Sequence, residues 1–102
     1  MTSSVGPLRE QIDAIDAQLL DLLNRRAGIS VELGRHKREA GLELRDLRRE
    51  EQILSRAREL NAGPLDPEAV ERLFRAILTE SRRAQASQAA PRHGLSAGGS
   101  PG

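Results

Sequence analysis

The sequence predicts an all-α fold of three helices, a long first helix followed by two shorter ones. In three segments the apolar residues recur at alternating three- and four-residue steps, which is the period of an amphipathic helix. Short stretches with Gly, Pro, Asn and Asp separate these segments, and no stretch shows the two-residue alternation of a half-buried strand.

The first predicted helix runs from Leu8 to about Glu39, with Pro7 just before it and Gly41 just after it. About thirty residues that rise ~1.5 Å each form a rod of roughly 45 Å. A compact domain of about 80 residues is only ~30 Å across. We therefore expect this helix to project from its own chain and to pack against the same helix of a second copy in a symmetric homodimer. A helix broken near Gly28 and folded back into a monomer is the alternative.

The second predicted helix runs from about Asp46 to Asn61, and the third from the Asp66-Pro67 pair to about Gln85. Acids in the first turn of the second helix complement the helix dipole. Gly and Pro residues that follow Asn61 are typical stop signals. Asp66 is a typical N-cap and Pro67 a typical first helical residue.

The chain divides into three parts. Residues 1–7 form a short N-terminal segment, residues 8–85 form one helical domain, and residues 86–102 are predicted to be a disordered tail or a linker. This last stretch reads ASQAAPRHGLSAGGSPG, and it cannot bury enough apolar surface to offset its ordering entropy. A core built from the remaining ~80 residues is marginal on its own, so oligomerisation helps.

Composition excludes several classes of function. Sixteen basic residues are interleaved with fifteen acidic ones and Phe74 is the one aromatic residue, so no nucleic-acid partner is expected. The chain has no cysteine, and His36 and His93 lack metal-ligand spacing, so we expect neither a metal nor another cofactor. We recognise no signal peptide and no apolar run of membrane-spanning length, which predicts a cytoplasmic protein without a membrane partner.

Polar side chains occupy positions that the helical period assigns to the core. The first helix has an apolar stripe at Ile12, Ile15, Leu19, Leu22, Ile29 and Leu33. The inward polar residues are Arg26 and Lys37 on the first helix, Asp46, Arg49 and Glu50 on the second, and Ser81 and Gln85 on the third. A buried charge is costly unless something pairs with it. Three amphipathic helices whose inward faces all turn polar therefore predict a lined pocket.

The chemistry of this set suits a small dianion. Arg26, with help from Arg9 or Arg49, could clamp two carboxylates with bidentate hydrogen bonds. Lys37 is the only lysine among sixteen basic residues, which indicates a compact ammonium rather than a guanidinium fork. Lys37 and Gln85 could donate to an oxygen that gains charge. Such a site would act by positioning and electrostatic stabilisation, without a covalent intermediate.

Simpler interpretations stand beside this one. The stem of Arg26 could pack while its head reaches water, and Asp46 could be an ordinary first-turn acid. Ser81 and Gln85 could mark only the end of the last helix. Glu50 faces inward at its position, and an ionised carboxylate there needs a donor, either an arginine or a ligand hydroxyl.

The sequence resembles the all-helical chorismate mutases, the AroQ class. Four ordered blocks carry the resemblance, and they read LREQIDAIDAQLLDLLNRR, LGRHK, RDLRREEQIL and GPLDPEAVERLFRAILTES. They span Leu8 to Gln85, almost the whole predicted domain. The resemblance implies an intertwined homodimer of three-helix subunits that converts chorismate to prephenate, a Claisen rearrangement on the route to phenylalanine and tyrosine.

The same resemblance implies how the substrate is bound. Arg9 would reach into the pocket of the partner chain and hold one substrate carboxylate. Arg26 would hold the other carboxylate, and Arg49 would support this anionic end. Asp46 and Ser81 would make secondary contacts.

Three further roles implied by the resemblance are catalytic. Lys37 and Gln85 would donate to the ether oxygen as the carbon–oxygen bond breaks, and Glu50 would accept from the ring hydroxyl. Each residue type that this pattern requires is present in the sequence at its place.

Other functions remain open at this point. Enzymes of the same fold act on isochorismate as pyruvate lyases or rearrange 4-amino-4-deoxychorismate, and Glu50 could accept from an amine as from a hydroxyl. A regulatory or dimerisation module of a larger shikimate-pathway enzyme, or a domain that associates with such an enzyme, would keep the same pocket. An arginine-rich DNA-binding helix would instead show strongly salt-dependent affinity for duplex.

Overall fold

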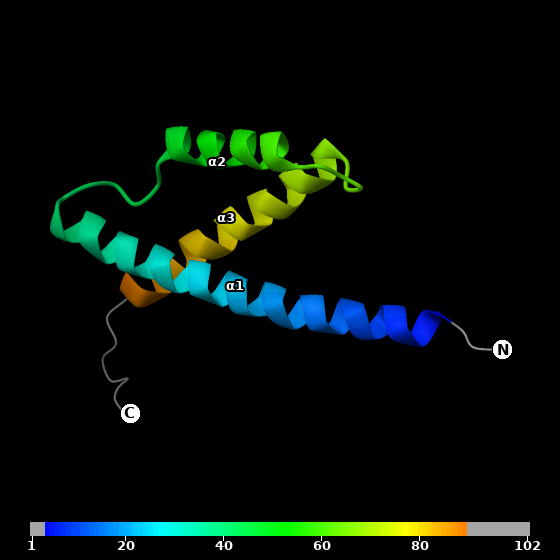
Figure 1. The fold of residues 1–102 in the computed structure, drawn as a ribbon. Helices are drawn as coiled ribbons and strands as arrows, with labels where there is room; N and C mark the ends of the chain where they lie inside the picture. The colour runs from blue at the N-terminus through cyan, green and yellow to red at the C-terminus, as the bar shows by residue number, and fades with distance from the viewer. Residues whose placement is uncertain (1–3, 90–102) are drawn as a thin grey trace, which may run out of the picture.

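The computed structural model describes residues 4–89, and these residues form three α-helices without a strand. The helices are α1 (Val5–Glu39), α2 (Leu47–Leu60) and α3 (Pro67–Ala89) (Figure 1). The predicted all-α fold, with one long and two shorter helices, is confirmed.

Helix α1 begins at Val5, three residues earlier than predicted. Pro7 is its third residue, and the backbone nitrogen there would have no acceptor within the helix, so proline costs no hydrogen bond. The helix continues through Gly28 without a break, so the alternative of a helix folded back at that glycine is wrong.

The end of α1 is a Schellman turn. Gly41 has a φ of +74°, which glycine adopts without the steric cost that a side chain would bring. The backbone N–H of Gly41 donates to Arg38 O at 3.1 Å, and that of Leu42 donates to Lys37 O at 2.8 Å. The turn directs the chain back toward α2.

Aspartate caps start both shorter helices, and the cap at Asp66 is the one that the sequence predicts. Asp46 Oδ1 accepts from the backbone N–H of Arg49 at 3.0 Å, and Asp66 Oδ1 accepts from that of Ala69 at 2.7 Å. Asn61 is the C-cap of α2. Helix α3 continues four residues beyond the predicted end at Gln85, because residues 86–89 contain no helix breaker. The rest of the predicted tail, residues 90–102, lies outside the described residues.

Helix α3 holds the chain together, because it packs against both α1 and α2. It crosses between the other two helices, while the N-terminal half of α1 extends away from them (Figure 1). The buried apolar core is small and lies on α2 and α3, at Leu54, Ala57, Val70 and Leu78. The Cα radius of gyration is 18.2 Å, against about 12 Å for a compact domain of this length.

The apolar stripe of α1 is largely uncovered within one chain. Its exposed large residues include Val5, Leu8, Ile12, Ile15, Leu19, Leu22, Ile29 and Leu33, each at least half exposed. This stripe is one continuous face of a long helix.

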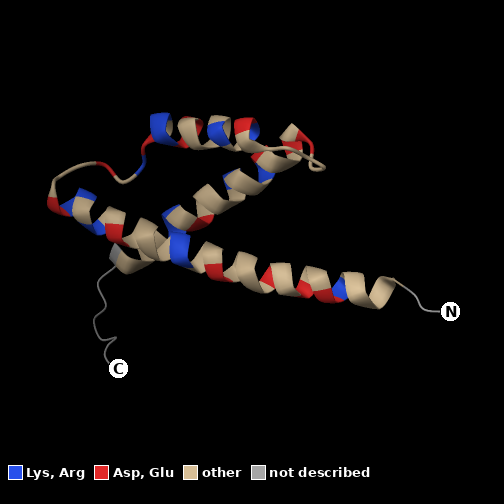
Figure 2. Cartoon of the chain, viewed as in Figure 1, with Lys and Arg blue, Asp and Glu red and all other residues tan. Residues whose placement is uncertain are grey.

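Charged residues of both signs occur on all three helices (Figure 2). Most of the ion pairs join residues three or four positions apart on one helix, such as Arg35 with Glu32 and Glu39. None of the helices within residues 4–89 is both long and apolar enough to cross a membrane.

Candidate active site

A pocket of about 430 Å³ lies where the second half of α1, the start of α2 and the second half of α3 meet. Seven of the eight candidate residues line it, namely Arg26, Lys37, Asp46, Arg49, Glu50, Ser81 and Gln85. Its remaining lining includes apolar side chains and two further arginines, Arg25 and Arg82. Cationic side chains outnumber the two carboxylates around this space, a composition that favours an anionic ligand.

Arg26 joins α1 to α3 across the pocket. Its Nη1 donates to Ser81 Oγ at 2.7 Å, and this hydroxyl donates in turn to Ile77 O at 2.9 Å. A guanidinium carries five N–H donors, and the others on Arg26 have no partner among residues 4–89. Ser81 therefore orients Arg26 and leaves donors for a ligand.

Lys37 lies in the last turn of α1. The Schellman turn that follows brings the loop between α1 and α2 close to its side chain. Its Nζ donates to Leu44 O at 3.2 Å. An ammonium has three donors, so one of them fixes the side chain and two remain. The turn that ends α1 thus also places the loop that orients its lysine.

Gln85 is the one buried polar residue of the described chain, with 7% of its surface exposed. Its Nε2 donates to the backbone carbonyl of Ser30 on α1 at 2.9 Å. The helices approach closely here because Gly34 has no side chain, and a Cβ at that position would lie 3.1 Å from Gln85 Cγ. One amide N–H is anchored and the second is left for a ligand.

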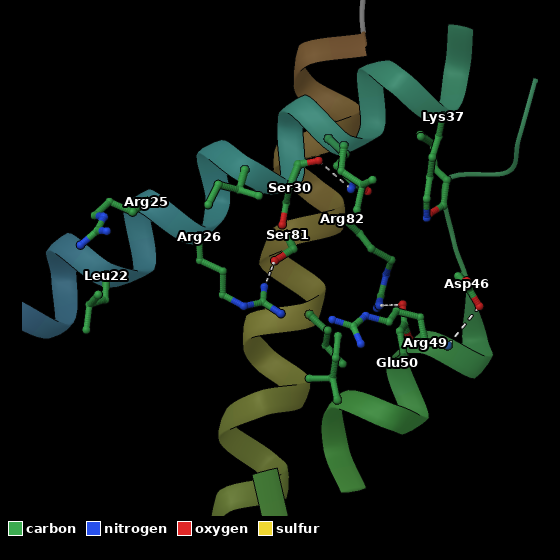
Figure 3. Close-up of a pocket in the computed structure, with 16 residues that line it drawn as sticks. Leu22, Arg25, Arg26, Ser30, Lys37, Asp46, Arg49, Glu50, Ser81 and Arg82 are labelled. Carbon is green, nitrogen blue, oxygen red and sulfur yellow. Dashed lines mark hydrogen bonds and ion pairs between the residues drawn. The ribbon is translucent and has the colours of Figure 1, made fainter. Parts of the chain in front are cut away.

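The start of α2 supplies the acids and one more cation. Asp46 is the N-cap of α2, where it accepts from Arg49 N, and its side chain also lines the pocket. The Arg49 guanidinium makes no hydrogen bond or ion pair within residues 4–89. Arg26, Arg49 and Arg82 extend toward the same space, whereas Arg25 points away from it (Figure 3).

Glu50 is held by two arginines. Arg82 Nη1 on α3 donates to Glu50 Oε2 at 2.7 Å, and Arg45 Nη2 lies 3.4 Å from Glu50 Oε1. The Glu50 side chain is only 18% exposed. An ionised carboxylate has about four acceptor sites, so Glu50 can still accept from a ligand.

Two residues of the pocket, Arg82 and Ser30, are not among the candidates predicted from the sequence. Arg82 lies four residues after Leu78 and three before Gln85, so the helical period places it on the inward face of α3. The helical period therefore predicts Arg82 as an inward residue beside the adjacent Ser81. Ser30 acts through its backbone carbonyl, which the residue type does not reveal.

Arg9 is the one candidate that this pocket does not include. It lies on the exposed N-terminal part of α1, away from the lining residues. No group of three or more His, Cys, Asp or Glu side chains within residues 4–89 is arranged to hold a metal ion.

A family model described as chorismate mutase type II matches residues 8–86. The chain belongs to this family. The match covers all of α2, most of α1 and α3, and every lining residue of the pocket. It confirms the resemblance drawn from the four sequence blocks.

Individual curated proteins are also similar to this chain. A bifunctional chorismate mutase/prephenate dehydratase from Neisseria gonorrhoeae is 42% identical over 74 residues, which cover 72% of this chain and 20% of that protein. A T-protein from Enterobacter agglomerans is 37% identical over 82 residues, which cover 79% of this chain and 22% of that protein. The chain therefore spans about a fifth of the length of these curated relatives.

The fold is also that of a solved chorismate mutase. Form II of the enzyme from Thermus thermophilus superposes with a TM-score of 0.82 at 31% sequence identity, and the match covers 84% of this chain and 98% of that one. The helical arrangement is therefore the one that this chorismate mutase adopts.

Proposed function

We propose that this chain is a chorismate mutase that rearranges chorismate to prephenate in the pocket between its three helices. The observation that carries the proposal is a set of oriented donors around one space. Arg26, Lys37 and Gln85 are each fixed by one hydrogen bond and keep further N–H groups for a ligand.

Substrate binding rests on the guanidinium groups. Chorismate carries two carboxylates, and a guanidinium matches a carboxylate with two parallel hydrogen bonds. Arg26 binds one carboxylate, supported by Arg49, whose side chain has no other partner among residues 4–89. Arg9 of a second copy binds the other carboxylate. Asp46 and Ser81 act indirectly, by holding the start of α2 and by orienting Arg26.

The reaction breaks one carbon–oxygen bond and forms one carbon–carbon bond within a single molecule. The ether oxygen gains negative charge as its bond breaks, and Lys37 and Gln85 donate to it. Glu50 accepts from the ring hydroxyl and fixes the ring. Preorganised donors of this kind stabilise developing charge without reorganising during the reaction, and holding the substrate in a reactive conformation lowers the barrier further.

The proposal includes an intertwined homodimer with two equivalent sites. The exposed apolar stripe of α1 supports it, since a face of this length and character is normally covered in solution. Two copies of α1 that pack along this stripe would bury it on both chains. Arg9 lies near the far end of the same helix and would then approach the pocket of the partner.

Association with another enzyme of aromatic amino-acid biosynthesis is a further part of the proposal. It is supported by the relative from Neisseria gonorrhoeae, whose name joins a chorismate mutase to a prephenate dehydratase. A domain that matches a fifth of such a protein is of a size to act beside a second catalytic unit.

The test is the loss of chorismate absorbance with the purified protein, followed by identification of the product. We expect prephenate as the product. Pyruvate with an aromatic acid would make the chain a lyase of the same fold instead. Tight binding of prephenate without turnover would identify a regulatory module, and either result would overturn the proposed activity.

A further inference from the structure

Arg82, an arginine to which the proposed reaction assigns no role, controls the surroundings of Glu50. Arg82 Nη1 lies 2.7 Å from Glu50 Oε2, a distance typical of a strong charge-assisted hydrogen bond. The two side chains are 33% and 18% exposed, so water screens them only in part. Glu50 thus belongs to an ion pair that bridges α2 and α3.

The guanidinium of Arg82 is itself fixed from α3. Its Nη2 lies 3.4 Å from Thr79 Oγ1, and this hydroxyl donates to Arg75 O at 3.0 Å. Arg45 lies on the other oxygen of Glu50 at 3.4 Å. One carboxylate therefore faces two cations, and the space beside it carries a net positive charge.

We propose that Arg82 makes the pocket selective for a substrate with a neutral hydroxyl, and against one with an ammonium, at the ring position that Glu50 contacts. The proposal rests on the proposed function and deepens it by naming a residue that sets the preference for the substrate hydroxyl. Arg82 is a specificity-determining and positioning residue, since it acts through Glu50 and through its own charge.

The physical argument is one of charge balance. A lone carboxylate attracts an ammonium more strongly than a hydroxyl, because the ammonium adds a full opposite charge. An amine on a substrate ring is largely protonated near pH 7. Beside a Glu50 that Arg82 and Arg45 already neutralise, the ammonium meets like charges, and such juxtaposition opposes binding. A hydroxyl donates one hydrogen bond to Glu50 and brings no charge.

The experiment compares two stable ligands that differ only at this position, prephenate and its 4-amino counterpart. Their dissociation constants are measured by titration calorimetry for the wild-type chain and for Arg82→Gln and Arg82→Lys. We expect wild type to bind prephenate more tightly. Arg82→Gln should shift the ratio of the two constants by about tenfold or more toward the amine, and Arg82→Lys should keep most of the wild-type preference because it keeps the charge.

Arg83→Gln is the matched control. Arg83 follows Arg82 directly but pairs with Glu80 on the exposed side of α3, where its side chain is 72% exposed. The control removes the same charge and should leave the ratio unchanged. Thermal melts followed by circular dichroism establish that each variant is folded.

The outcomes separate the inference from the proposed function. A ratio in Arg82→Gln that equals the wild-type ratio would overturn the inference, as would the same shift in Arg83→Gln. Failure of the wild-type chain to convert chorismate would overturn the proposed activity, while the ratio of the two constants would still decide the role of Arg82. Failure to bind either ligand would overturn both.

Discussion

Three side chains that line the pocket are each fixed by one hydrogen bond and keep further N–H groups for a ligand. Ser81 holds Arg26, the carbonyl of Leu44 holds Lys37, and the carbonyl of Ser30 holds Gln85. Side chains that are already oriented lose less rotamer freedom when a ligand binds. At the scale of residues, the pocket is therefore preorganised for an anion.

Replacement of Lys37 tests this preorganisation. We expect Lys37→Ala to lower turnover of chorismate about a hundred- to a thousandfold, because loss of one transition-state donor typically costs ~3–4 kcal/mol. The helical fold should survive, since the ammonium is anchored to a single carbonyl oxygen in the loop before α2. Steady-state kinetics and circular dichroism measure the two effects. A variant that kept a tenth of wild-type activity would show that Lys37 has no such role.

The sequence predicted the pocket well where helical period alone decides which way a side chain faces. Arg26, Lys37, Glu50 and Gln85 continue apolar stripes, and all four line the pocket. The helical period does not predict which side chains on different helices contact one another. The ion pair of Glu50 with Arg82 depends on how α2 and α3 pack, and the residues are 32 positions apart.

At the scale of elements, the close approach of α1 and α3 decides where Gln85 lies. The two helices can approach at this point because Gly34 presents only backbone to the Gln85 side chain. In the sequence alone, a glycine at this position is only an unfavourable residue inside a long helix. The need for glycine at this position comes from its contact with Gln85, which is distant in the sequence.

The two mid-helix glycines of α1 make a matched pair of variants. Gly34→Ala should displace Gln85 by a few tenths of an ångström and lower kcat about tenfold with little change in KM, because reaction rates are sensitive to such misplacement. Gly28→Ala has open space around its Cβ. It should stabilise the helix by about 1 kcal/mol and leave kcat unchanged. Equal kinetics for both variants would contradict the role given to Gly34.

A second contact between elements involves Glu71 and predicts a dependence of stability on pH. Glu71 accepts from Arg75 Nε at 2.9 Å on its own helix and from Arg58 Nη1 on α2 at 3.1 Å. The hydrogen bond from Arg75, followed by the positive charges of Arg75 and Arg58, lowers the pKa of Glu71 below its ordinary value.

Because the pKa of Glu71 is lower in the folded chain, its contribution to stability is present above the unfolded-state pKa of about 4.3. The contribution is lost as the pH falls through the folded-state pKa. Glu71→Gln should therefore lower Tm slightly at pH 7 and leave it unchanged at a pH well below 4. Glu59→Gln, at an exposed acid without an ion pair within residues 4–89, is the control. If Glu71→Gln still had a lower Tm than the wild type at a pH well below 4, the ionised Glu71 carboxylate would not be the source of the stability.

At the scale of the whole molecule, one chain is extended and thinly packed. Its apolar core consists of four buried side chains, while a row of large apolar residues along α1 lies open. The projection of α1 from its own chain could be predicted from the sequence, because the length of the helix depends only on the number of residues without a breaker. The path of the loops, and hence which helices touch, could not be derived from periodicity.

The exposed stripe predicts the assembly state. We expect the purified chain to sediment as a species of twice 11.2 kDa, since association buries the apolar face of α1. Leu19→Glu places a charge in the stripe and should give a monomer without mutase activity. Ala17→Glu adds the same charge on the opposite face of α1, where the side chain is exposed, and this variant should remain dimeric. Analytical ultracentrifugation distinguishes the two, and a dimeric, active Leu19→Glu would contradict the proposed interface.

The most direct test of the central claim mixes two inactive variants. Arg9→Ala and Lys37→Ala each damage every site of their own homodimer. In a mixed dimer one site combines Lys37 from the first variant with Arg9 from the second, and it is intact. After unfolding and refolding the two together, random pairing predicts recovery of about a quarter of wild-type prephenate formation. Activity of the mixture no greater than that of its parents would contradict a chorismate mutase site shared between two chains.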